Sequence, residues 1–138
     1  MSKTINGVIS GLSATIVLSL LFVMKNKIGV MPEMNMIVML SSMMGGALVF
    51  GWMMHFMVGI GYGIAFSQIN GILPGKNFIT KGVFIGVVGW LGMMVMLMPM
   101  MGAGMFAMKL GMMAPIMTLV LHVIFGTVLG WTYQKLAS

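Results

Sequence analysis

Cysteine, arginine and aspartate are absent from this 138-residue chain, and Glu33 is its only acidic residue. Without cysteine there is no disulfide, thiolate zinc site, iron–sulfur cluster or thiol nucleophile. A single carboxylate cannot supply the acid pair of a glycosidase or an aspartic protease, and a Ser–His–Asp triad needs aspartate. The chain also contains no Walker or Rossmann phosphate loop. We therefore expect a protein that is not an enzyme.

Charge of either sign is scarce, with 6% of residues charged and 60% hydrophobic. Soluble domains have about 25% charged residues, so the sequence predicts that lipid surrounds most of this chain. The seven lysines stand singly at the edges of apolar runs, as in membrane proteins whose basic residues lie near lipid headgroups. No basic patch is interleaved with base-stacking aromatics, which argues against nucleic-acid binding.

Four apolar segments are each long enough to cross a bilayer as a helix. They lie at residues 5–24, 44–68, 78–98 and 112–133. The chain stays apolar from residue 35 to residue 69, which is too long for a single span. We expect residues 34–43 to form an extra short helix. A second interpretation is a five-span protein broken at Gly45–Gly46.

The lysines divide unequally between the two sides of a four-span protein. One side holds Lys3, Lys76, Lys81 and Lys135, and the other holds Lys25, Lys27 and Lys109. Basic residues favour the cytoplasmic side. The sequence thus predicts a single transmembrane domain over residues 1–138, in the bacterial inner membrane, with both termini in the cytoplasm.

Matching motifs indicate an internal repeat of two hairpins, residues 1–70 and 76–138. Each hairpin has a Gly-x3-Gly pair in its first helix and a His-x3-Gly-x3-Gly motif in its second. Small residues one turn apart let helices approach closely, and two equally oriented copies imply a pseudo-two-fold axis along the membrane normal. The predicted packing residues are Gly7, Gly11, Gly59, Gly63, Gly82, Gly86, Gly126 and Gly130.

Several segments together resemble one family across nearly the whole chain. They are "NGVISGLSATIVLSLL", "MPEMNMI", "GWMMHFMVGIGYG", "LPGKN" and "APIMTLVLHVIFGTVLGWTY". The chain resembles a family of small bacterial membrane proteins that is classed only as a domain of unknown function. The resemblance implies an integral membrane protein of this size, and it implies no substrate, activity or catalytic residue.

Methionine is abundant, and 20 of the 22 methionines fall in two blocks, residues 24–54 and 93–117. These blocks occupy the half of the bundle opposite the glycine pairs. One interpretation is that methionine fills apolar volume adaptably in place of leucine. The other is that its thioethers bind Cu(I). The candidate thioether ligands are Met31, Met34, Met36, Met53, Met57, Met113 and Met117.

His55 and His122 occupy equivalent positions near the middle of their spans, where polar groups usually face the bundle interior. Three interpretations stay open. Each imidazole could hydrogen-bond across helices, the pair could ligate haem b, or the pair could form a metal or proton site in a transport path.

The leading functional hypothesis is a non-enzymatic accessory or packing subunit in the membrane, associated with itself or with a larger membrane complex. The alternatives are a Cu(I) or haem b protein that uses His55, His122 and the methionines, and a small transporter. Lipid is the one partner that the composition requires.

Overall fold

The computed structural model describes all 138 residues, and every regular element in it is helical. The α-helices are α1 (Lys3–Lys27), α2 (Met36–Ser42), α3 (Leu48–Ile69), α4 (Phe78–Gly92), α5 (Met98–Met100) and α6 (Met113–Ala137). A π-helical turn, Met93–Leu97, joins α4 to α5, and a short 3-10 segment covers Met105–Leu110. Four helical runs, Lys3–Lys27, Leu48–Ile69, Phe78–Met100 and Met113–Ala137, are long and apolar enough to cross a membrane. The predicted all-α membrane fold, with four spans and a short extra helix, is confirmed.

The second span begins later than the predicted residue 44, because two glycines interrupt the chain before it. Gly45 and Gly46 have φ of 95° and 93°, a left-handed conformation that glycine adopts without steric cost. They separate α2 from α3. With 7 residues, α2 is too short to cross a bilayer, so the five-span interpretation is wrong.

The third span continues past Pro99, where the sequence analysis ended it. Proline has no N–H and its ring crowds the carbonyl four residues earlier. The helix accommodates this by widening just before the proline, and the N–H of Met98 donates to the carbonyl of Met93, five residues back. The helical run therefore reaches Met100.

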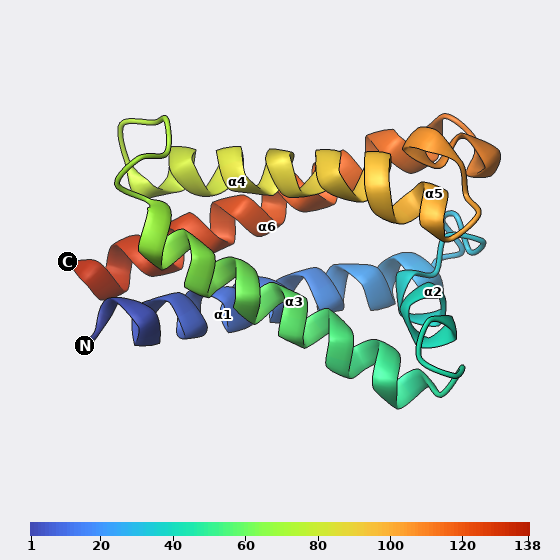
Figure 1. Ribbon diagram of the computed structural model, residues 1–138, viewed down its shortest axis with the longest axis horizontal. Helices are drawn as coiled ribbons and strands as arrows, with labels where there is room; N and C mark the ends of the chain where they lie inside the picture. Colours follow the sequence, from blue (N-terminus) through green and yellow to red (C-terminus); the bar gives the residue numbers. More distant parts are fainter.

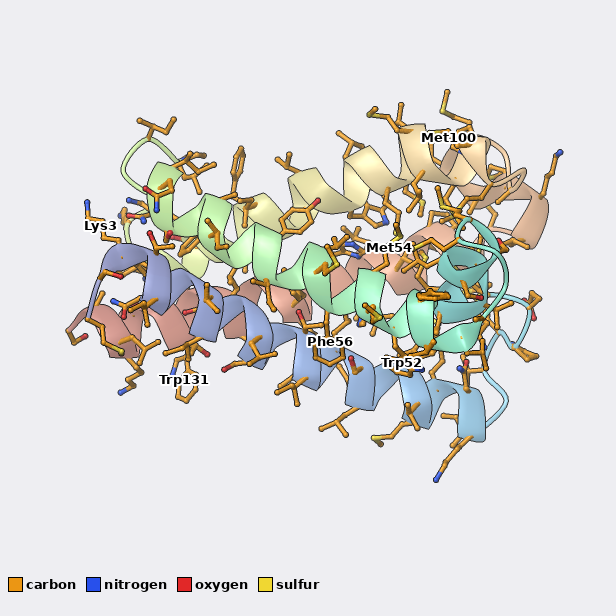
Figure 2. All side chains as sticks on the ribbon, turned by 60° about the horizontal axis from the view of Figure 1, so that its bottom comes forward. Lys3, Trp52, Met54, Phe56, Met100 and Trp131 are labelled. Atoms are coloured by element: carbon orange, nitrogen blue, oxygen red, sulfur yellow. The ribbon has the colours of Figure 1, made fainter.

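The four spans are arranged as two packed pairs with an uneven opening between them. Helix α1 packs on α3, α4 packs on α6, and α1 also contacts α6. Figure 1 shows both termini at one end and α2 and α5 at the other, with α3 diverging from α4 toward the second end. We call these the termini end and the methionine end. Figure 2 places Lys3 at the first and Met100 at the second.

Glycines bring the helix backbones into contact within each pair. A Cβ atom on Gly11 would lie 2.5 Å from the carbonyl oxygen of Gly59 in α3. A Cβ on Gly82 would meet the carbonyl of Gly126 in the same way. Gly82 therefore has the same place in the second helix pair that Gly11 has in the first. The sequence motifs instead matched Gly82 with Gly7, which lies one helical turn before Gly11. The motif spacing could not reveal this shift, because it does not record which turn of the partner helix each glycine meets.

Two buried clusters form the interior. The aromatic core, toward the termini end, consists of Ala14, Phe66, Ile85, Phe125, Leu129 and Tyr133. The methionine core, toward the methionine end, consists of Met34, Met94, Met98, Ala103, Ala107 and Ala114. The methionine blocks of the sequence are therefore only partly interior, since methionines such as Met96 and Met100 are 67% and 73% exposed.

Candidate functional site

A cavity of about 170 Å³ lies between the helices and borders both cores. Helices α1, α2, α3, α4 and α6 all contribute to its wall, most of which is apolar. His55 from α3 and His122 from α6 both line it. The tertiary structure therefore brings to one cavity two histidines that are separated by 67 positions in the sequence.

His122 is held in one tautomer by its own helix. Its Nδ1 lies 2.8 Å from the carbonyl oxygen of Thr118, one turn earlier. A carbonyl oxygen can only accept, so Nδ1 carries the proton and donates it. The other ring nitrogen, Nε2, is then unprotonated and has a free lone pair.

His55 is held in the opposite tautomer by a serine of α1. Its Nε2 lies 3.1 Å from the hydroxyl oxygen of Ser19, and that hydroxyl donates its single proton to the carbonyl of Thr15 at 2.7 Å. The Ser19 oxygen can therefore only accept from His55. With the Ser19 proton on the Thr15 carbonyl, the proton of His55 is assigned to Nε2, and Nδ1 has the free lone pair.

Neither free nitrogen is sealed inside packed protein. The buried side-chain atoms without a hydrogen-bond partner belong to Asn6, Asn26 and Gln134, and to no histidine. Both imidazoles thus combine a lone pair with a hydrogen bond from the opposite ring nitrogen. Protein histidines that bind metals have this arrangement, because the second hydrogen bond orients the ring and raises its basicity.

Four thioethers line the same cavity, from Met34, Met36, Met93 and Met117. Met93 was not among the seven candidate thioether ligands named from the sequence. It lies seven residues after Gly86, another cavity-lining residue of the same helical run, and this spacing places both residues on one helix face. That periodicity is the signal that could have found it.

The other candidate methionines do not reach the cavity. Met31 packs against the methionine core. Met53, Met57 and Met113 are 53%, 69% and 58% exposed, so they face outward. Their one-turn spacing, which suggested paired ligands, places them on a lipid-facing surface instead.

Lys25 also lies on the cavity wall, and only 8% of it is exposed. Sequence analysis placed it at the lipid headgroups. Its ammonium instead donates three hydrogen bonds, to the carbonyl oxygens of Val30 at 3.0 Å, Met31 at 2.9 Å and Met34 at 3.2 Å. These bonds fold the α1–α2 connection back over the end of α1. The three carbonyl acceptors match the three protons of a lysine.

Trp90 fixes the position of α4 against α6 near His122. Its indole N–H lies 3.1 Å from both the carbonyl oxygen of Pro115 and the hydroxyl oxygen of Thr118. The same Thr118 supplies the carbonyl that orients His122. The tryptophan therefore supports the site without lining it.

Comparison with known proteins gives the chain a family. The match to that family covers residues 1–138. The chain belongs to DUF6789, a family of unknown function. The resemblance to an uncharacterised family, predicted from the motifs, is confirmed. No curated protein and no solved structure matches the chain.

The donor atoms of this DUF6789 protein restrict the chemistry of its cavity. No group of three or more His, Cys, Asp or Glu side chains comes together. Haem b ligation by His55 and His122 stays a prediction. A cavity of about 150 Å³ holds a molecule the size of benzene, so a porphyrin bound here would extend beyond the cavity. The cavity wall contains imidazole nitrogens and thioether sulfurs, together with the hydroxyls of Thr15, Tyr62 and Thr118 and the Lys25 ammonium.

Proposed function

We propose that this DUF6789 protein is a non-enzymatic membrane protein that binds Cu(I) in its interhelical cavity. One observation carries the proposal. Two imidazoles, each oriented by a hydrogen bond to one ring nitrogen and each with a free second nitrogen, share the cavity wall with four thioethers.

The softness of the donors selects the metal. Thioethers and neutral imidazoles suit Cu(I), whereas carboxylates and water suit Mg²⁺, Ca²⁺ and Mn²⁺. The charge of the ion matters as well, because a cation inside a membrane is costly. The cavity has no carboxylate to balance it, and the Lys25 ammonium already lies on its wall. These conditions favour a monovalent ion over a divalent one.

The proposed orientation has both termini in the cytoplasm and the methionine end on the opposite side of the bacterial inner membrane. Lys25 is buried and cannot act as a headgroup lysine. Removing it from the lysine distribution leaves Lys3, Lys76, Lys81 and Lys135 on one side against Lys27 and Lys109 on the other. The bias toward cytoplasmic termini is therefore larger than the sequence alone suggested.

The test is a Cu(I) titration of the purified protein in detergent under reducing conditions, in competition with a chromophoric Cu(I) chelator. We expect one ion per chain, and we expect His55→Ala and His122→Ala each to lower the affinity by about tenfold or more. Met53→Leu with Met57→Leu is the matched control, because both side chains face outward. Unchanged affinity in the double histidine variant refutes the proposal.

Ser19→Ala tests the orientation of His55 separately. The substitution removes the only acceptor for the Nε2 proton of His55 and leaves the ring in place. Outer-shell partners of metal ligands contribute about 10- to 100-fold to metal affinity. We expect weaker Cu(I) binding with unchanged helical content, and equal affinity in this variant would contradict the assigned tautomer.

The accessory-subunit hypothesis stays a prediction, and native mass spectrometry of the detergent-extracted protein checks it. A stoichiometric second protein would support that role. Self-association would appear as a multiple of the 14.9 kDa chain.

A further inference from the structure

We infer that the cavity exchanges Cu(I) only through the methionine end, so that the protein receives and returns the ion on one side of the membrane. The inference rests on the proposed function and adds the direction of access. It follows from how the two ends of the bundle are closed.

Backbone contact closes the termini end. The glycine crossings place helix against helix with no side chain between them, as at Gly11 and Gly59, where even a Cβ atom would lie 2.5 Å from a carbonyl oxygen. An ion with its ligands cannot pass through such a contact. The glycines at these crossings also provide no donor side chain.

Aromatic packing closes the rest of that end. Phe66 and Leu129 have no exposed surface and Tyr133 has 3%. The ring of Tyr133 lies 5.3 Å from that of Phe66 and 5.1 Å from that of Phe78, centroid to centroid. These apolar side chains would leave a cation without ligands in a medium of low dielectric. No methionine lies between residues 58 and 92 or after residue 117. Met1, at the N-terminus, is 74% exposed, so no soft donor lies in the interior of this end.

The methionine end has the opposite character. The four cavity thioethers all belong to the methionine core or pack against it. Partly buried Met31, Met39 and Met101 also pack against the same core. Thioether sulfur is thus present from the cavity wall to the periphery of this end, where Met100 is 73% exposed.

Ligand exchange along these sulfurs needs no water-filled channel. At each step one thioether–copper bond forms as another breaks, and the copper stays Cu(I) with no electron or proton transferred. The flexible thioether side chain, with three rotatable bonds, suits this exchange. Leucine has a similar volume and no donor atom, so Met→Leu removes the ligand with little change in packing.

The first experiment measures the rate at which the purified protein takes Cu(I) from the chromophoric chelator, by stopped flow. We expect Met31→Leu with Met101→Leu to slow capture severalfold and to leave the equilibrium affinity unchanged, because neither residue lines the cavity. The outward-facing pair Met53→Leu with Met57→Leu is the control and keeps the original rate. An unchanged capture rate in the Met31/Met101 variant overturns the thioether route.

The second experiment measures sidedness in proteoliposomes. The chain has no cysteine, so Ser2→Cys with an impermeant maleimide reports which end faces outward. Cu(I) is added outside the vesicles. An impermeant chelator is placed outside the vesicles in one experiment and inside them in a second. We expect protein-bound copper to be captured only by chelator facing the methionine end. Capture from the termini end overturns the inference and indicates a transporter. A failure of the proposed function is distinct, since no histidine-dependent copper would then bind in detergent.

Discussion

The contact between α4 and α6 gives a sharp prediction about stability. A Cβ atom on Gly86 would lie 2.5 Å from the carbonyl oxygen of His122, which is about 0.9 Å closer than the 3.4 Å at which ordinary contact begins. The obstacle is backbone, which cannot rotate away, so the helices must separate. Overpacking of this kind costs about 1–3 kcal/mol. Alanine recovers about 0.5–1 kcal/mol through its higher helix propensity, so Gly86→Ala should destabilise the protein by about 1–2 kcal/mol.

Gly92 in the same helix is the matched control, because nothing lies within 4 Å of a Cβ built there. Gly92→Ala should be neutral or stabilising by up to about 1 kcal/mol. The assay is reversible unfolding by sodium dodecyl sulfate in mixed micelles, followed by helical circular dichroism. The two variants should differ by about 1–3 kcal/mol. Equal free energies of unfolding would refute the close backbone contact on which the termini-end closure depends.

Three further predictions use the same unfolding assay. Lys25→Met should destabilise the protein by about 1.5–3 kcal/mol, the net contribution of hydrogen bonds to a charged group. Lys27→Met, at an exposed position, should change the free energy of unfolding little. Equal effects of the two substitutions would contradict the three carbonyl contacts of Lys25. Met94→Ala should cost about 2 kcal/mol or more because Met94 is fully buried, and Met96→Ala, 67% exposed, should cost less than half as much; a reversed order would place the methionine core elsewhere. Trp90→Phe should lose about 0.6–1.7 kcal/mol from its interhelical hydrogen bonds and weaken Cu(I) binding slightly through Thr118; full stability would show that the indole N–H has no partner.

The fold was predictable because its main determinants are local. A span needs about 20 apolar residues, and a break needs residues such as Gly45 and Gly46, so both are visible in a short window of sequence. The start of α3 and the passage of the helix through Pro99 could not be predicted from the sequence. The start of α3 depends on which of several small residues ends the break. The passage through Pro99 depends on a hydrogen bond from the Met98 N–H to the carbonyl of Met93, five residues back in place of four.

The candidate site was predictable only in part. The two histidines were found because a polar residue in the middle of a span is costly and therefore conspicuous. The cavity methionines were not separable from the others, because a helix that is apolar all round gives no periodic signal for its inner face. Met36 lines the cavity and Met57 faces outward, although both had seemed equivalent candidates.

The sequence by itself determined the environment and the number of spans, because the scarcity of charge and the length of the apolar runs act residue by residue. It also limited the candidate side-chain metal donors mainly to imidazoles and thioethers, because the chain has no cysteine or aspartate and a single glutamate. Only the tertiary structure decided that Lys25 turns inward, that the glycine crossings meet one turn out of the expected register, and that two imidazoles in opposite tautomers share a cavity with four thioethers. Those features depend on how helices far apart in the chain are rotated and shifted against one another, and in a uniformly apolar sequence no local pattern records that rotation.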